Sequence, residues 1–230
     1  MKPPHWPVGR YDVILADPPW TFATRSNKGK GRSPEQHYSC MTLDDIKALP
    51  VPDLAAKDCA LLLWVTDPLF DVGLDVIKAW GFTYKTIGYH WVKLNKDGSP
   101  FTGMGYYTRA NPELCLLATR GSPKRKDRGV PRLILTEEDW SEEDRIIMSP
   151  RREHSRKPDE AYERTERLLG GTYCELFARQ QRPGWTCWGD QVDRFPSLDP
   201  SIDDLLDDLL CDGVTHTAVP PVENVLDDLL

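Results

Sequence analysis

The stretch with the most suggestive chemistry is Asp17-Pro18-Pro19-Trp20, which directly follows the apolar run Val13-Ile14-Leu15-Ala16. An apolar, β-branched run is typical of a strand buried on both faces, and the two prolines end it because proline has no N–H for the sheet. A carboxylate, two carbonyl groups and a large aromatic side chain therefore gather at a strand's carboxyl end. In open α/β sheets this edge is where ligands bind.

These residues suit methylation of an exocyclic amine on a nucleobase. Such an amine presents two N–H groups, and its lone pair is delocalised into the ring. Asp17 can accept one N–H and the Pro18 carbonyl the other, which aims the nitrogen at a methyl donor. Trp20 offers a face on which a base can stack. The simpler interpretation of the same tetrapeptide is a strand end and a tight turn, with Asp17 as a cap.

Four further stretches accompany this tetrapeptide: Leu61–Val65, His154–Glu160, Glu175–Arg179 and Trp185–Gln191. Together the five resemble, in order and rough spacing, the N6-adenine methyltransferases related to the catalytic subunit of the eukaryotic mRNA methyltransferase. The resemblance covers about residues 11–195. It implies S-adenosylmethionine as cofactor and a Rossmann-like methyltransferase sheet with helices on both faces. It also implies a circularly permuted motif order, with the catalytic motif first and the cofactor motifs last.

The resemblance also assigns roles to single residues. Lys157 is expected to bind the cofactor carboxylate, and Glu175 with Arg179 the ribose. Asp190 and Gln191 match a final turn that contacts the nucleoside. The family often has asparagine where this chain has Asp190, and an ionised carboxylate only accepts hydrogen bonds. The expected catalytic residues are Asp17, Pro18, Pro19 and Trp20.

Simpler interpretations stay open for these residues. Lys157 can be an ordinary exposed lysine, and Glu175 can be a charge at a sheet edge, although a carboxylate within an apolar strand is costly. His154 is expected to be a solvated loop histidine, and Trp64 a core residue rather than a stacking surface.

Charge is unevenly distributed along the 230 residues. The net charge of −7 at first argues against a nucleic-acid partner. Residues 199–230, however, hold nine acidic residues and no Lys or Arg, so the rest of the chain carries 29 basic and 27 acidic residues. We therefore expect a near-neutral methyltransferase domain over residues 1–198 and an acidic, flexible tail over residues 199–230.

The tail repeats a pattern of paired aspartates and leucines, in Ile202–Leu210 and again in Val225–Leu230. Each copy can form a short amphipathic helix on the surface of a protein partner, because isolated helices of this length are marginal in water. The alternatives are a solubilising tail and a mimic of nucleic acid that shields the basic loops.

Two basic clusters are the expected contacts to phosphates. Each can also be an ordinary solvated loop. The first follows the catalytic motif and comprises Arg25, Lys28, Lys30 and Arg32; the second comprises Lys124, Arg125, Lys126 and Arg128.

Cysteine spacing and hydropathy argue against other classes of protein. The six cysteines include no C-x-x-C pair, so no metal site is expected, and Cys59, Cys115 and Cys174 lie in apolar runs as small core residues. No apolar run reaches the length of about 18 residues that suggests a membrane span. No signal peptide opens the chain, which favours a cytoplasmic location, and the compactness favours a phage or bacterial origin.

Strand and helix patterns alternate around these motifs, which predicts an α/β sheet with helices on both faces. The strand that ends at Asp17 and the strand with Glu175 should be neighbours at the sheet's switch point. Asp97-Gly98 is a hairpin signal between strands 82–94 and 113–119. The other strands are expected at 59–65, 145–148 and 173–178, and the helices from Thr42 to Pro50, at 67–80 and at 158–169.

Taken together, the sequence predicts direct transfer of a methyl group from S-adenosylmethionine to the N6 amine of adenine in nucleic acid, without a metal or a covalent intermediate. DNA is favoured over RNA because compact single-chain relatives are commonly phage or bacterial DNA enzymes. An RNA-directed enzyme stays open, and so does a non-catalytic nucleic-acid-binding scaffold. The intact Asp17–Trp20 motif argues against the scaffold.

Overall fold

The computed structural model describes residues 5–21, 41–95, 97–103, 105–137 and 157–195. Several predictions fall outside these residues. They are the first basic cluster (Arg25, Lys28, Lys30, Arg32), the strand at 145–148, His154, and the acidic tail with its boundary at residue 198.

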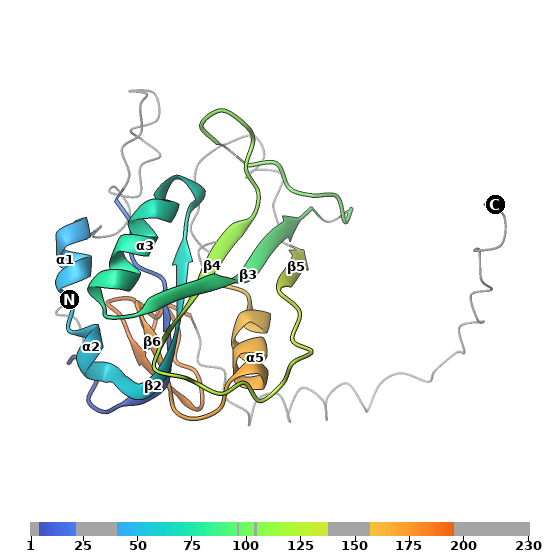
Figure 1. Ribbon diagram of the computed structural model, residues 1–230. Coiled ribbons are helices and arrows are strands. Elements are labelled where there is room, and N and C mark those ends of the chain that lie inside the picture. Colours follow the sequence, from blue (N-terminus) through green and yellow to red (C-terminus); the bar gives the residue numbers. More distant parts are fainter. Residues whose placement is uncertain (1–4, 22–40, 96, 104, 138–156, 196–230) are drawn as a thin grey trace, which may run out of the picture. The chain divides into compact units, whose positions relative to one another are not determined.

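A seven-stranded sheet with the order β5-β3-β4-β2-β1-β6-β7 forms the centre of the described structure (Figure 1). Only β4 runs antiparallel to its neighbours β2 and β3, whereas all other pairs are parallel. The predicted α/β class is therefore confirmed. The strands are β1 (Tyr11–Ala16), β2 (Ala55–Val65), β3 (Thr83–Leu94), β4 (Glu113–Arg120), β5 (Leu133–Glu137), β6 (Tyr173–Leu176) and β7 (Trp185–Trp188).

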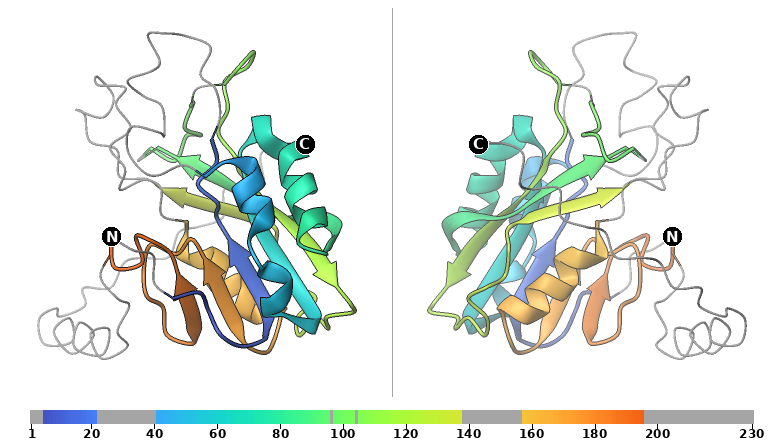
Figure 2. Two further views of the ribbon diagram at one scale, coloured as in Figure 1. Left: turned by 90° about the vertical axis from the view of Figure 1, so that its left-hand side faces the viewer. Right: turned by 90° about the vertical axis from the view of Figure 1, so that its right-hand side faces the viewer.

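Helices cover both faces of the sheet, as predicted (Figure 2). The helices of one face are α1 (Leu43–Ala48), α2 (Val51–Leu54), the 3₁₀ turn η3 (Asp67–Leu69) and α3 (Phe70–Ala79), and α5 (Asp159–Leu168) covers the other. Alternate residues of the central strands supply the two cores. Ile14 and Leu61 pack on the α1–α3 side, whereas Leu15 and Leu62 pack on the α5 side.

Local sequence signals account for the start of α1 and the end of α3. Thr42 caps α1 by accepting the backbone N–H of Asp45 at 3.2 Å, as the capping pattern predicts. The helix expected at 67–80 begins as the 3₁₀ turn η3 and continues as α3. It ends before Gly81, whose φ of +78° is readily adopted only by glycine.

The structure adds two strands that the pattern does not predict, β5 and β7, and both lie at the edges of the sheet. Strand β6 also stops earlier than expected, because Phe177 turns the chain with a φ of 67°. The three cysteines expected in the core, Cys59, Cys115 and Cys174, are buried free thiols. Among the described helices, none is long and apolar enough to cross a membrane.

Candidate active site

Strands β1 and β6, which are far apart in the sequence, lie side by side in the sheet. Ala16 pairs with Leu176, and the backbone N–H of Asp17 donates to the Leu176 carbonyl at 3.3 Å. Strands β2 to β5 lie on one side of β1, and β6 and β7 lie on the other. This is the predicted switch point, where diverging loops leave a crevice for ligands.

A cavity opens at this switch point and collects four of the nine predicted catalytic and cofactor-binding residues. They are Asp17, Lys157, Glu175 and Arg179, which come from three separate stretches of the chain. Its full lining is Asp17, Lys157, Tyr162, Glu175, Phe177, Arg179, Gln180 and Arg182.

Asp190 and Gln191, also predicted to contact the cofactor, do not line this cavity. Asp190 is exposed in the turn after β7, and the Gln191 side chain accepts a hydrogen bond from Arg194 at 3.1 Å. Their role at the cofactor therefore stays a prediction.

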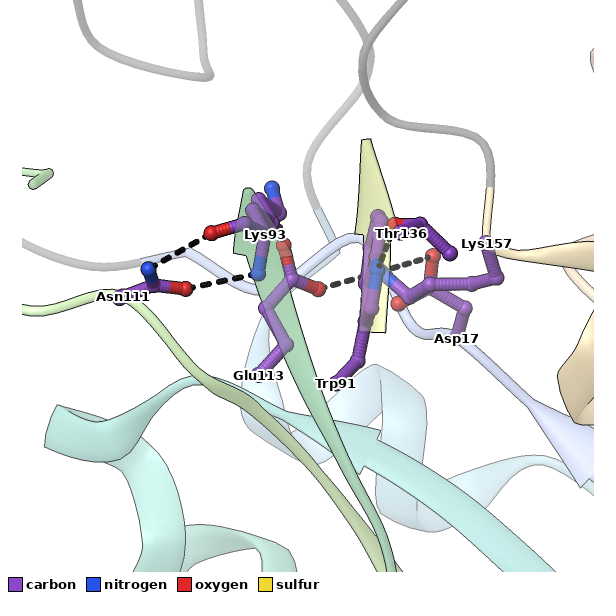
Figure 3. A network of polar contacts seen from close by, with 7 residues as sticks. All are labelled: Asp17, Trp91, Lys93, Asn111, Glu113, Thr136 and Lys157. Atoms are coloured by element: carbon purple, nitrogen blue, oxygen red, sulfur yellow. Dashed lines mark hydrogen bonds and ion pairs between the residues drawn. The ribbon is translucent and has the colours of Figure 1, made fainter. Parts of the chain in front are cut away.

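Lys157 links the catalytic motif to the hairpin formed by β3 and β4 (Figure 3). Its Nζ lies 3.1 Å from Asp17 Oδ2 and 2.9 Å from Glu113 Oε2. Lys93 Nζ in turn lies 2.9 Å from Glu113 Oε1. The pairing of Trp91 with Glu113 explains this contact, because Lys93 follows Trp91 by two residues and shares its face of β3. The four charged side chains form one continuous ionic chain.

Burial and pairing shift the pKa values of two members of this chain in opposite directions. Burial alone raises the pKa of Glu113, but the ammonium groups of Lys157 and Lys93 outweigh it and lower that pKa to about 2. Burial alone lowers the pKa of Lys157, but the carboxylates of Asp17 and Glu113 raise it above its usual range. Both groups are therefore charged at neutral pH.

Lys157 is not an ordinary exposed lysine, since only 11% of its side chain is accessible. Its ammonium also lies 5.3 Å from the centre of the Trp64 ring, and Trp64 is a core residue as expected. An ammonium has three N–H donors, so two carboxylates and a third anion can share it. The lysine thus fits a cofactor carboxylate next to Asp17.

Glu175 lies in the interior of the sheet, so the interpretation as an edge charge is wrong. On β6 it pairs with Leu15 of β1 and Cys187 of β7 and is only 7% exposed. The Tyr162 hydroxyl donates to its Oε1 at 2.7 Å. Burial raises the pKa of Glu175 to about 7, although the hydrogen bond from Tyr162 opposes the shift. A carboxylate with one oxygen thus held can accept sugar hydroxyls with the other.

Arg182 closes the same corner of the cavity. Its guanidinium lies 3.8 Å from the centre of the Tyr162 ring and pairs with Asp159 at the start of α5. Tyr162 also packs edge-on against Trp185 of β7, at 5.4 Å between ring centres. These two contacts restrain the Tyr162 ring and so help to fix its hydroxyl against Glu175.

Trp20 does not offer the exposed stacking face that the sequence predicts. It is only 6% exposed, because its ring packs in the α1–α3 core and its indole N–H donates to the Trp64 carbonyl at 3.0 Å. The Pro18 carbonyl accepts the Trp20 backbone N–H at 2.8 Å. A carbonyl has two lone pairs, so Pro18 can still accept a second N–H.

The second basic cluster lies at the opposite edge of the sheet from Asp17. Arg120, the last residue of β4, pairs with Cys59, whereas the other end of β4 lies beside Val65 and the active site. The cluster follows Arg120 directly, so it lies at the amino edge of the parallel strands. Its members Lys124, Arg125, Lys126 and Arg128 are exposed.

Sequence reasoning misses four residues of this site: Lys93, Glu113, Tyr162 and Arg182. A hint exists only for Glu113, a carboxylate that opens an apolar strand. Within the described residues, no group of three or more His, Cys, Asp or Glu side chains could hold a metal ion.

Comparison with known proteins identifies the family. The MT-A70 family profile matches residues 11–191. The chain is 30% identical over 212 residues to the N(6)-adenosine-methyltransferase catalytic subunit METTL3 of Homo sapiens, which covers 90% of this chain but 32% of METTL3. It is 32% identical over 198 residues to the N(6)-adenosine-methyltransferase MT-A70-like protein of Drosophila melanogaster, covering 84% of this chain and 29% of that protein.

A bacterial relative matches along most of both chains. The chain is 27% identical over 205 residues to the Type II methyltransferase M.MunI of a Mycoplasma species, which covers 82% of this chain and 81% of M.MunI. By contrast, the chain spans about a third of the length of the eukaryotic relatives. Because the family profile matches most of the chain and METTL3 is 30% identical over 90% of it, this chain belongs to the MT-A70 family.

Proposed function

We propose that this chain transfers a methyl group from S-adenosylmethionine to the N6 amine of adenine in DNA. One observation carries the proposal. Asp17, suited to hold an amine, lines the same cavity as Lys157 and Glu175, which suit the two ends of an amino-acid nucleoside. The cavity lies at the switch point between β1 and β6, where ligands of open α/β sheets bind.

The polar groups of the cavity match the chemistry of the cofactor. MT-A70 methyltransferases use S-adenosylmethionine as the methyl donor. Lys157 would bind its carboxylate, and Glu175 would accept hydrogen bonds from its ribose hydroxyls. Arg179, which also lines the cavity, would contact the same sugar. When bound, the cofactor supplies an electrophilic methyl group.

Asp17 and Pro18 would orient the adenine. The carboxylate of Asp17 accepts one N–H of the amine, and the free lone pair of the Pro18 carbonyl accepts the other. This arrangement turns the nitrogen lone pair toward the methyl donor and stabilises positive charge as the new bond forms. A carboxylate is too weak a base to deprotonate a neutral aromatic amine, so the nitrogen is methylated first. The resulting cation is far more acidic and then gives its proton to the Asp17 carboxylate.

The ionic chain would hold Asp17 in the orientation that this step needs. Lys157 contacts one carboxylate oxygen of Asp17, which leaves the other for the amine. Glu113 in turn binds Lys157, and Lys93 binds Glu113. Their part in catalysis is therefore positioning, since neither needs to touch the substrate.

DNA is the proposed substrate because the chain matches a Type II methyltransferase over four-fifths of both lengths. A bacterial or phage origin accords with the same relative. The eukaryotic relatives are named as N(6)-adenosine-methyltransferases, which keeps RNA as the alternative. The site itself does not separate the two, because both nucleic acids present adenine.

Nucleoside mass spectrometry tests the proposal. The purified chain is incubated with deuterated-methyl S-adenosylmethionine and with DNA or RNA, and the products are digested to nucleosides. The proposal expects labelled N6-methyl-adenine in DNA. Label in RNA alone would identify the alternative substrate. No label in either, with cofactor binding intact, would favour a binding scaffold.

The acidic tail, residues 199–230, is a second point to test. We propose that it docks on a protein partner through its leucine and aspartate repeats, because these follow helical spacing. Truncation after Leu198 should then leave activity in vitro unchanged and abolish capture of the partner. Tighter nucleic-acid binding by the truncated chain at low salt would instead indicate that the tail shields basic surface.

A further inference from the structure

The connection between β3 and β4 carries two adjacent tyrosines in solvent. Tyr107 is 98% exposed and Tyr106 is 62% exposed. Thr108 and Arg109, which follow them, are exposed as well. We call residues Tyr106–Arg109 the hairpin tip. Two aromatic rings and a guanidinium therefore stand together at a place where they contribute little to the core.

The hairpin tip is held in a closed shape. The Gly103 N–H donates to the Ala110 carbonyl at 2.7 Å, which joins the two sides of the connection. Gly105 approaches the Thr108 carbonyl so closely that a Cβ at Gly105 would lie 2.0 Å from that oxygen. A tip closed in this way presents its side chains from a fixed base, which lowers the entropy lost on binding.

The base of the tip is fastened to the candidate active site (Figure 3). The Asn111 side chain accepts the Lys93 N–H and donates to the Lys93 carbonyl, both at 2.9 Å. It also donates to the Phe101 carbonyl at 2.5 Å. Lys93 in turn binds Glu113 in the ionic chain that reaches Asp17. The tip and the catalytic motif are thus parts of one hydrogen-bonded framework.

The tip also emerges on the same side as the catalytic motif. Leu114, near the start of β4, pairs with Val65 at the carboxyl end of β2, and Ala16 pairs with Leu63 of the same strand. The connection before β4 therefore lies at the edge of the sheet where Asp17 lies. Figure 1 shows it projecting beyond the ends of β3 and β4.

This placement suits contacts to the nucleotides on either side of a target adenine. A nucleic acid with one adenine at Asp17 must run its neighbouring nucleotides across this edge. Tyrosine rings stack on bases whose faces are open, whereas the faces of paired bases in a duplex are covered by their neighbours. Arg109 can contact a phosphate or stack in the same way.

We infer that the hairpin tip binds unpaired nucleotides that flank the target adenine, so that the preferred substrate is single-stranded or locally opened. The inference rests on the proposed function, since it needs the adenine to sit at Asp17. Unpaired DNA and unpaired RNA offer the same base faces and phosphates. Separate DNA and RNA oligonucleotides therefore distinguish the source.

The test is fluorescence anisotropy with the full chain and four labelled probes of one adenine-containing sequence. The probes are single-stranded DNA, single-stranded RNA and the two corresponding duplexes. The double variant Tyr106→Ala/Tyr107→Ala should lose about tenfold or more in affinity for at least one of the two single-stranded probes, DNA or RNA. The reason is that each base stacked on an aromatic ring is worth about 1–3 kcal/mol. Duplex binding should change little. The matched control Tyr106→Phe/Tyr107→Phe keeps both rings and should bind like the wild type.

Arg109→Ala provides an independent readout. If Arg109 contacts a phosphate, the salt dependence of single-strand binding should become shallower by about 0.7 in slope. Lys85→Ala removes an exposed charge at the start of β3, at the opposite edge, and should leave the slope unchanged. The tyrosine double variant should also leave it unchanged, because stacking releases no counterions.

Three results would overturn the inference: unchanged single-strand affinity in the double variant, equal losses on duplex and single strand, or equal losses in the phenylalanine control. The single variant Tyr107→Ala guards against misfolding, since a side chain that is 98% exposed does not support the fold. Failure of the proposed function looks different. In that case the wild-type chain itself deposits no methyl label on any probe.

Discussion

The charged side chains at the two edges of the sheet differ in their exposure to solvent: those at one edge are buried and paired, whereas those at the other are exposed. At the carboxyl edge, the side chains of Lys157 and Asp17 are only 11% and 16% accessible, and each meets an oppositely charged partner. At the amino edge, Lys124, Arg125, Lys126 and Arg128 are exposed to solvent. The sequence makes the amino edge more conspicuous, because its charges are adjacent. The buried and less conspicuous set is the one that lies beside the catalytic motif.

The amino-edge charges already have structural contacts. The Lys126 backbone N–H donates to the Leu168 carbonyl at 2.9 Å, and Lys126 Nζ donates to the Glu166 carbonyl at 3.2 Å. Both carbonyls belong to the last turn of α5, where positive charge is favourable. A run of basic residues can therefore end a helix as well as attract a phosphate.

Asp17→Asn should cause the largest effect, because it removes the charge that meets the amine. The methyl-transfer rate should fall by about 10²–10³, the usual cost of one positioned electrostatic contact. Affinity for S-adenosylhomocysteine, measured by calorimetry, should stay within error of the wild type. A variant that retains most of its turnover would exclude the proposed role of Asp17.

Glu113→Ala should destabilise the fold, because it leaves Lys93 and Lys157 without a shared partner. We expect a loss of about 2 kcal/mol in the free energy of unfolding, typical of hydrogen bonds to charged groups. The matched control Asp75→Ala breaks the exposed pair with Lys47, in which Asp75 is 65% accessible, and should cost less than about 1 kcal/mol. Urea denaturation measures both values, and equal losses would contradict the contrast between buried and exposed pairs.

The same glutamate sets an acid dependence. Its folded pKa of about 2 lies below the ordinary value of 4.5, so the folded chain binds this proton more weakly than the unfolded chain. Its contribution to stability is therefore present above pH 4.5 and is lost as the pH falls toward 2. Glu113→Gln should show a shallower loss of stability over that range.

Glu175 should make cofactor affinity depend on pH near neutrality. With a folded pKa of about 7, it is largely protonated at pH 6 and largely ionised at pH 8. An ionised carboxylate is the better acceptor for ribose hydroxyls, so S-adenosylhomocysteine should bind roughly five- to tenfold more tightly at pH 8. Glu175→Gln should flatten this dependence in calorimetry. A wild-type affinity that does not change with pH would remove Glu175 from the pocket.

The effect of Glu175 on folding stability changes with pH in the opposite direction to its effect on cofactor binding. Its pKa is raised above the ordinary 4.5, so the folded state is favoured below that value, and this advantage is lost as the pH rises through about 7. Glu175→Gln should therefore stabilise the chain relative to wild type at pH 8 while weakening cofactor binding. Higher stability together with weaker binding in a variant is typical of a buried group kept for function rather than for folding.

Neutralising Lys124, Arg125, Lys126 and Arg128 should have the smallest effect on turnover. The six residues of β1 separate the two edges by roughly 20 Å at the usual rise per residue. A short oligonucleotide at Asp17 should therefore react normally, whereas a long one should bind more weakly and with a shallower salt dependence if the cluster contacts phosphates. An unchanged salt slope on both substrates would identify the cluster as a solvated loop.

The sequence predicts the parts of the site that belong to compact motifs. Asp17 follows an apolar run and Glu175 lies within one, so their adjacency at the switch point is predictable. Glu113 and Lys93 meet through the pairing of β3 with β4, which no local pattern shows. Tyr162 reads as an ordinary residue on the buried face of α5, and only the position of that helix over β6 brings its hydroxyl to Glu175.

The same dependence on tertiary contacts explains why the sequence misses two strands and the burial of Trp20. Strands β5 and β7 are only five and four residues long and lie at the edges of the sheet, where one side has no neighbouring strand. Trp20 was expected to face a base because of its motif, but its indole meets the Trp64 carbonyl in the core. A residue's type states what it can bind, whereas tertiary packing decides which surface reaches solvent.

The most direct test of this account is a crystal structure with S-adenosylhomocysteine bound. We expect the ligand at the carboxyl edge, with its ribose on Glu175, its carboxylate on Lys157 and its sulfur facing Asp17. A second cavity lies at the amino edge and is lined by Asp12, Asp58, Ser122, Pro123, Lys124, Arg125, Lys126, Leu169 and Gly170. A ligand in that cavity, with the Asp17 cavity empty, would contradict the central claim.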